Sequence, residues 1–268
     1  MSTNTQLGQL PRPTFARTVR GAGPGLALAH GAGGSIDGNY GPILDELAAG
    51  HTVVGVDYPG TGATPRSERP LDLDELADQL VAAADAEGLE TFAVAGYSLG
   101  GPVAIRAAIR HPERVKALIL TATFAQRDTK LALAADVWHR LDAAGDRELL
   151  AKYLNLIALS TTALRSLTDE QLQAAVTGLA GAIAAGTPEQ TELVGRADVR
   201  DDLARIAVPT LVIVTGRDPL VSPELQRELA AAIPGARLAV LDAGHLPIVE
   251  QPETWRDLIT GFLAEYQR

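Results

Sequence analysis

Short apolar runs alternate with amphipathic stretches along the first 121 residues. The apolar runs lie at 26–29, 52–56, 92–95 and 115–121. Their length and their small and β-branched residues favour buried strands. Apolar residues at helical spacing mark the stretches between them, at 40–49, from 72–75 onward and at 103–110. The alternation of strand and helix predicts an α/β fold with a mostly parallel, doubly wound sheet, preceded by an edge strand at 14–20.

The pattern changes after residue 125. Four helical stretches follow one another without a convincing strand, at 130–143, 146–159, 169–185 and 188–196. Strand and helix patterns then return at 209–215, 223–232, 237–241 and 253–266. We therefore expect one core domain built from 1–124 and 206–268, with an all-helical cap inserted at 125–205.

Two of the inserted helices carry a helix-start signal. Thr168 is followed three residues later by Gln171, and Thr187 by Gln190. This spacing predicts capping boxes, in which each side chain satisfies an amide at the helix N-terminus. Pro188 fits the first helical position of the second box. Residues 1–12 are expected to form a loose terminal arm.

A serine between two glycines ends the third apolar run of the core. The segment Gly96-Tyr-Ser98-Leu-Gly100 separates a predicted strand from a predicted helix. This is the context of a G-x-S-x-G nucleophile elbow, where a sharp turn exposes the serine hydroxyl. Glycines at both ends remove the Cβ atoms that would collide in so tight a turn. Ser98 is therefore a candidate nucleophile.

A serine hydroxyl needs a base, and the base needs an acceptor that fixes its tautomer. Ligands of α/β sheets bind at the carboxyl ends of the strands. The strand at 209–215 is followed by Asp218, and the strand at 237–241 by Asp242 and His245. His245 is the candidate base, and either aspartate is a candidate partner for it, with Asp218 favoured.

Composition excludes several classes of function. The chain has 268 residues, 46% of them hydrophobic, and a formal charge of −10. It lacks a basic cluster, so nucleic acid is not an expected partner. No apolar run reaches the roughly 18 residues that cross a bilayer, and no signal peptide is visible, so we expect no membrane contact and a cytoplasmic protein. Cysteine is absent, which excludes thiolate catalysis and thiolate metal sites.

Four segments together resemble the α/β-hydrolase fold superfamily with a helical cap. They are Gly96–Gly101, His30–Gly34, Thr215–Val221 and Ala243–His245, and the resemblance covers about 14–266. It implies Ser98 as nucleophile, His245 as general base and then acid, and Asp218 as the orienting carboxylate. The resemblance also implies that the backbone N–H groups of Ala32 and Leu99 form the oxyanion hole.

Other residues receive smaller roles. Asp57 begins a turn resembling one in the family in which Thr64 replaces a serine, and we interpret Asp57 as structural. His30 is expected to order the oxyanion loop. The candidate substrate-binding residues are Tyr97, Gly31, Trp138 and His139. No His-x-x-x-His pair or G-x-G-x-x-G loop is present, so no metal or cofactor is expected.

The predicted activity is hydrolysis of a small carboxylic ester, lactone or thioester through an acyl-enzyme. The same triad also serves C–C hydrolases, lyases, cofactor-free haloperoxidases or oxygenases, and cyclases, and the sequence does not separate these reactions. A hydrolase-like receptor for a small molecule is a further alternative. The predicted partner is a small-molecule substrate, whereas the sequence does not predict an oligomeric state.

Overall fold

A seven-stranded sheet forms the centre of the computed structural model, which describes residues 15–266. The strands are β1 (Arg17–Arg20), β2 (Gly25–Ala29), β3 (Thr52–Val56), β4 (Phe92–Tyr97), β5 (Val115–Thr121), β6 (Thr210–Thr215) and β7 (Arg237–Leu241). Their order across the sheet is β1-β3-β2-β4-β5-β6-β7. Only β1 runs antiparallel to its neighbour among these strands, so the predicted mostly parallel sheet is confirmed. The predicted terminal arm at 1–12 lies outside the described residues.

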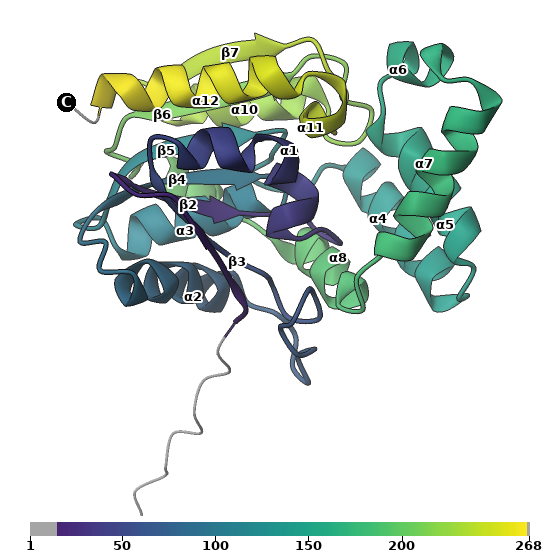
Figure 1. Ribbon diagram of the computed structural model, residues 1–268, viewed down its shortest axis with the longest axis horizontal. Helices are drawn as coiled ribbons and strands as arrows, with labels where there is room; N and C mark the ends of the chain where they lie inside the picture. Colours follow the sequence, from purple (N-terminus) through teal and green to yellow (C-terminus); the bar gives the residue numbers. More distant parts are fainter. Residues whose placement is uncertain (1–14, 267–268) are drawn as a thin grey trace, which may run out of the picture.

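Helices cover both faces of the sheet (Figure 1). One layer contains α1 (Ile36–Ala48), α11 (Pro247–Glu250) and α12 (Pro252–Tyr266). The other contains α2 (Leu73–Ala86), α3 (Gly100–Arg110), α9 (Arg200–Leu203) and α10 (Pro223–Ala232). Side chains alternate along each strand, so Leu28 of β2 packs under the first layer and Ala27 under the second. The core is therefore a pair of apolar layers on either side of the strands.

Helix α1 begins four residues before the predicted start at residue 40. Ser35 is its N-cap, and the Ser35 hydroxyl accepts a hydrogen bond from the Gly38 N–H at 2.9 Å. This bond satisfies an amide that the helix itself leaves unpaired. Pro42 consequently lies inside the helix and not near its start. The capping serine, which the sequence reading did not use, sets this boundary.

The segment between β5 and α9 is helical. It contains α4 (Thr129–Ala143), α5 (Arg147–Ala158), α6 (Thr161–Ser166), α7 (Asp169–Ala182) and α8 (Thr187–Arg196). Figure 1 shows α4 to α7 gathered at one end of the molecule, beyond the sheet. The two ends of the segment meet at a single antiparallel bridge between Gln126 and Asp198. The division into a core domain and a cap at 125–205 stays a prediction.

The two predicted capping boxes have different outcomes. Thr168 and Gln171 form both bonds of the box at the start of α7, so this prediction is confirmed. The second prediction is wrong, because Gly186 is the N-cap of α8 and Thr187 lies within the helix. Gln190 points away from the helix N-terminus and bonds to two loops of the core.

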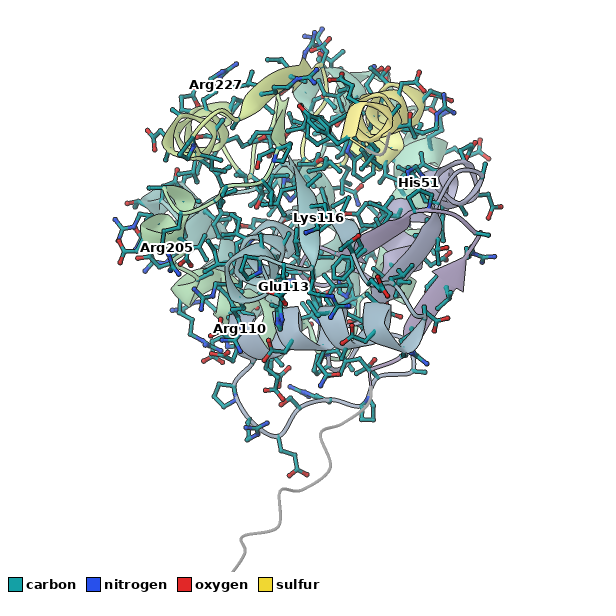
Figure 2. The ribbon with its side chains drawn as sticks, turned by 90° about the vertical axis from the view of Figure 1, so that its left-hand side faces the viewer. His51, Arg110, Glu113, Lys116, Arg205 and Arg227 are labelled. Atoms are coloured by element: carbon teal, nitrogen blue, oxygen red, sulfur yellow. The ribbon has the colours of Figure 1, made fainter. Side chains whose placement is uncertain are left out.

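Charged side chains gather at the end of the sheet opposite α4 to α7 (Figure 2). Arg110, at the end of α3, forms ion pairs with Asp74 and Asp78 of α2 at 2.9 and 2.8 Å. Glu113 and Lys116 lie beside it where the chain enters β5. No helix among residues 15–266 combines the length and the hydropathy needed to cross a membrane.

Candidate active site

Ser98 lies at the tip of the turn between β4 and α3. Its φ of 52° is in the left-handed region that residues with a side chain seldom adopt. The turn is possible because a Cβ at Gly96 would lie 2.3 Å from the Gly100 carbonyl oxygen, and a Cβ at Gly100 would lie 2.1 Å from that of Ala29. Both glycines are therefore required by close backbone contact, as the elbow pattern predicts.

Three side chains from separate loops form one hydrogen-bonded chain. His245 Nε2 lies 3.0 Å from Ser98 Oγ, and His245 Nδ1 lies 2.8 Å from Asp218 Oδ2. All three residues are buried. With an ionised Asp218 accepting from Nδ1–H, the Nε2 atom carries the lone pair that faces the serine hydroxyl. This is the arrangement that activates a serine as a nucleophile.

The Asp218 carboxylate is held by five donors. Oδ1 accepts from the Leu220 and Val221 N–H groups, each at 2.9 Å. Oδ2 accepts from the Thr215 hydroxyl at 2.8 Å and from Gln226 Nε2 at 3.2 Å, in addition to His245. Hydrogen bonds to a carboxylate favour its charged form and fix its orientation. Asp218 is therefore placed to orient the imidazole.

Asp242, the alternative acid, does not contact His245. It is exposed and pairs with Arg217, whose Nη2 lies 2.8 Å from Asp242 Oδ2. Of the two aspartates, Asp218 is the one that the structure places beside His245, and its role as the orienting acid stays a prediction.

Gln226 of α10 is a member of this network that the sequence reading missed. Its side chain is fully buried, accepts from the Thr215 N–H at 2.9 Å and donates to the Val221 carbonyl at 2.8 Å. Its amide therefore joins the end of β6 to the loop that carries Asp218. The available signal was a glutamine three residues before Leu229, on the buried face of a predicted amphipathic helix.

The loop after β2 approaches the serine closely. A Cβ at Gly31 would lie 3.1 Å from Ser98 Cβ and 2.9 Å from the Tyr97 ring. The Gly31 N–H donates to Asn39 Oδ1 at 2.9 Å, which ties the loop to α1. Ala32 follows directly and lines the cavity beside Ser98. Glycine is needed at position 31 because any side chain would push this loop away from Tyr97 and Ser98.

Leu99 and Ala32, the predicted oxyanion donors, are brought to the same site by different elements. Leu99 immediately precedes α3, with its side chain buried in the core. Ala32 is anchored on its far side by Gly33, whose N–H donates to Gln190 Oε1 at 2.8 Å. Their action as oxyanion donors stays a prediction.

His30 is buried and neutral. Its Nδ1–H donates to the Gly31 carbonyl at 2.8 Å, its Nε2 accepts from the Tyr58 N–H at 3.0 Å, and its ring stacks on Tyr58. Burial lowers the pKa of His30 to about 4, against a smaller opposing effect of its bond to Gly31. Both ring nitrogens are thus occupied by the backbone, as expected for a residue that orders the loop.

Tyr97 contacts His245 through both its hydroxyl and its ring. Its hydroxyl donates to the His245 carbonyl at 2.8 Å, and the two rings are 5.4 Å apart. Burial raises the pKa of Tyr97 well above its ordinary value, so the hydroxyl stays protonated. Tyr97 also lines the cavity, and its contact with substrate stays a prediction.

A cavity of about 640 Å³ opens over the Ser98 hydroxyl. Its far wall comes from the helical segment and is mainly apolar, with Leu131, Trp138, Leu154, Leu179 and Ile183 among its members. Asp57 is the one carboxylate among the described lining residues, and no lysine or arginine lines it. This lining suits a neutral, largely apolar ligand.

Trp138 and His139 differ in their position relative to this cavity. Trp138 lines it and packs over Gly33, where an added Cβ would lie 2.8 Å from the indole ring. His139 does not line it, which corrects the expectation that this residue contacts substrate. Consecutive helical residues point about 100° apart, so His139 faces a separate, polar cavity of about 480 Å³ with Arg66 and Arg147.

Asp57 has the structural role expected of it. Its Oδ1 accepts from the Ile36 N–H at 2.9 Å, at the start of α1. Thr64, which replaces the serine of the family turn, donates to the Asp57 carbonyl and accepts from the Ala16 N–H, both at 2.8 Å. The threonine hydroxyl thus makes the turn bonds. Within residues 15–266 no group of three or more His, Asp or Glu side chains has the arrangement of a metal site.

Comparison with known proteins gives consistent matches. A model of the alpha/beta hydrolase fold family matches residues 26–252. The chain is 32% identical over 247 residues to pyrrolizixenacetamide deacetylase of Xenorhabdus hominickii, covering 91% of this chain and 92% of that protein. It is also 32% identical over 252 residues to pimeloyl-(acyl-carrier protein) methyl ester esterase of Neisseria meningitidis serogroup B, covering 88% and 93%.

A solved structure supports the fold independently. An alpha/beta hydrolase enzyme from a Medee basin deep-sea metagenome library superimposes with a TM-score of 0.85. The match covers 93% of this chain and 94% of that one at 19% identity, so it bears on the fold alone.

Proposed function

Because this chain belongs to the α/β-hydrolase fold family, we propose that it is a serine hydrolase that cleaves a small carboxylic ester, lactone or thioester through an acyl-enzyme. The relatives named as a deacetylase and an esterase, each 32% identical over most of the chain, support a hydrolytic enzyme over a receptor. The observation that carries the proposal is the hydrogen-bonded chain from Ser98 through His245 to Asp218 at the floor of the cavity.

Acylation begins when Ser98 Oγ attacks the substrate carbonyl carbon. His245 Nε2, 3.0 Å away, takes the hydroxyl proton as the C–O bond forms. The imidazolium that results lies beside the ionised Asp218, whose charge stabilises it. His245 then returns the proton to the leaving alcohol or thiol, and the tetrahedral intermediate collapses to acyl-Ser98.

Deacylation repeats these steps with water. His245 removes a proton from the water, the hydroxyl attacks the acyl carbon, and Ser98 leaves with the proton that His245 returns. In both halves the N–H groups of Ala32 and Leu99 would hold the oxyanion. Each such donor is worth roughly 3–4 kcal/mol of transition-state stabilisation, because it is oriented before the charge develops.

The cavity limits the substrate class. Its described lining holds no lysine or arginine to pair with a carboxylate or phosphate, and Asp57 would repel such groups. We therefore expect a neutral substrate with an apolar acyl or ring portion against the helical wall. The deacetylase relative adds an N-acetyl amide to the ester, lactone and thioester candidates.

The test is hydrolysis of a panel of p-nitrophenyl esters, lactones, thioesters and N-acetyl amides. The matched blank is Ser98→Ala, which keeps the fold and removes the nucleophile. We expect turnover of at least one class by the native enzyme and a loss of roughly 10⁴-fold or more in the variant. Retention of more than a few per cent of the activity by Ser98→Ala would contradict the acyl-enzyme scheme. Covalent phosphonate trapping on Ser98 without turnover of any member of the panel would favour lyase, C–C hydrolase, oxygenase or cyclase chemistry on the same triad.

A further inference from the structure

Gln190 is a fully buried amide that the reaction scheme above does not use. It lies on α8, in the helical segment, yet all the hydrogen bonds of its side chain run to the core. Oε1 accepts from the Gly33 N–H at 2.8 Å, while Nε2 donates to Thr61 Oγ1 at 2.9 Å and to the Pro59 carbonyl at 3.2 Å. One side chain therefore joins the loop after β2 to the loop after β3.

The N-terminus of α8 is in direct backbone contact with the core. The Gly186 N–H donates to the Gly60 carbonyl at 3.0 Å. A Cβ at Gly186 would lie 2.0 Å from the Pro59 oxygen, and one at Gly60 would lie 2.3 Å from Gly186 Cα. This backbone contact between two glycines brings α8 close enough for the glutamine to reach Gly33. The position of Gln190 is thus fixed on both sides.

The amides of the loop at 31–34 are almost all occupied. The Gly31 N–H donates to Asn39, the Gly33 N–H to Gln190, and the Gly34 N–H to the Gly31 carbonyl at 3.2 Å. Among these four described residues, only the Ala32 N–H has no acceptor within the protein. Two side chains thus hold the amides on either side of it.

We propose that Gln190 is a positioning residue, which sets the oxyanion donor at Ala32 by fixing the Gly33 peptide. The inference rests on the proposed function, because it assigns Gln190 a share in that oxyanion hole. Asn39 does the same from the core side, through Gly31. The oxyanion hole is therefore complete only when α8 is docked, and the helical segment contributes to the chemistry as well as to the cavity wall.

The amide suits this position because it accepts and donates at once. Oε1 faces a backbone N–H, and Nε2 faces a carbonyl oxygen and a hydroxyl. A glutamate would keep the acceptor for Gly33 but would face the Pro59 carbonyl without a donor. A methionine of similar length would lose every one of these hydrogen bonds.

The experiment compares the rates at which a p-nitrophenyl phosphonate labels Ser98 in three proteins. They are the native enzyme, Gln190→Met and Arg66→Gln. The control removes another contact between α8 and the core, the Arg66–Glu189 ion pair at 2.8 Å, which does not touch the loop at 31–34. Phosphonylation develops negative charge on an oxygen in the oxyanion hole, so its rate reports the donors without a known natural substrate.

We expect Gln190→Met to slow labelling roughly 10- to 100-fold, and Arg66→Gln to stay within about twofold of the native rate. With an ester substrate, Gln190→Met should lower kcat in the same proportion and change KM little. Gln190→Glu, which keeps the Gly33 acceptor, should recover part of the rate. If the methionine variant fails to fold, Gln190→Leu, which also lacks the acceptor, replaces it in the comparison with the same expected loss.

The possible results separate the inference from the proposed function. Equal labelling rates in native, Gln190→Met and Arg66→Gln proteins, or an equal loss in both variants, overturn the role of Gln190 while Ser98 labelling upholds the nucleophile. A change confined to KM also overturns it. A native enzyme that is not labelled at Ser98 instead contradicts the proposed function itself.

Discussion

The two walls of the cavity are built in opposite ways. The sheet side presents Ser98, His245 and Asp218, with every side-chain hydrogen bond of the triad made inside the core. The helical side presents apolar side chains such as Leu154 and Leu179. One wall fixes the positions of three hydrogen-bonded side chains, and the other fixes the volume of the cavity. Such a difference allows the volume to change without disturbing the chemistry.

The walls meet at a few polar contacts beside the reacting groups. The His245 N–H donates to the carbonyl of Ala158, at the end of α5, at 2.7 Å. Glu250 of α11 accepts from the N–H and the hydroxyl of Ser160 at 2.8 and 2.6 Å. Together with Gln190, these bonds place the helical wall against the loops that carry His245 and Ala32. The helical wall therefore also contributes polar contacts where it meets the sheet wall.

The largest effect should separate the two aspartates of the sheet wall. We expect Asp218→Asn to lower kcat by roughly 10⁴-fold, because the amide favours the wrong tautomer of His245 and removes the charge that stabilises its protonated form. Asp242→Asn breaks only the exposed pair with Arg217 and should stay within about twofold. Steady-state kinetics on one ester checks both variants. Similar losses in the two would contradict the assignment of Asp218.

The pH dependence of the free energy of unfolding tests whether the fold keeps His30 neutral. His30 has a pKa near 6.5 when unfolded and about 4 when folded, so between these values the unfolded chain binds more protons. The free energy of unfolding should therefore fall as pH drops from 6.5 to 4, by about 3 kcal/mol from this residue.

The matched variant for that measurement is His30→Gln. Its free energy of unfolding should be lower than that of the native enzyme at pH 7, because the stacking on Tyr58 is lost. The gap between the two proteins should narrow toward pH 4.5 in urea titrations. Parallel curves across this range would show that His30 is not held neutral by the fold.

The smallest effect should come from the helical wall and should change selectivity. Leu179 of α7 lines the cavity, and Leu179→Ala would enlarge it. We expect the preference for longer acyl chains, measured as a ratio of kcat/KM values, to rise roughly tenfold, with little change in kcat for the best ester. Leu172→Ala, at an exposed position of the same helix, is the control and should leave the ratio unchanged. An equal shift in both would mean that the wall does not select substrate.

The sheet wall was predictable because its chemistry depends on backbone geometry that the sequence encodes locally. The two glycines around Ser98 indicate a tight turn that only glycine permits. The apolar strands that precede Asp218 and His245 end at the same edge of the sheet, which brings these two residues together. The roles assigned to these residues come from the resemblance to the α/β-hydrolase fold family and stay predictions. The choice between Asp218 and Asp242 needed the structure, because both follow strands that end at the same edge.

The helical wall was less predictable because its contacts join segments far apart in the sequence. Thr187 and Gln190 have the spacing of a capping box, yet the glutamine bonds to a loop 157 residues away. No local pattern encodes that distance. Trp138 and His139 are adjacent in sequence, and only the rotation of α4 in the fold decides that the tryptophan faces the cavity. Four helices of this segment were predicted to within about three residues at each end, whereas α6 was not predicted. The helix faces that line the cavity could not be predicted either.

The most direct test of the acyl-enzyme is to isolate it. An activated carbamate ester acylates serine hydrolases and leaves a carbamoyl group that water removes slowly, so the intermediate can be mapped by mass spectrometry of peptides. For an acyl-enzyme on Ser98, we expect one carbamoyl group per chain, on Ser98, with activity lost in proportion to labelling. Ester turnover that continues while Ser98 stays unlabelled, or labelling at another residue that abolishes activity, would contradict it.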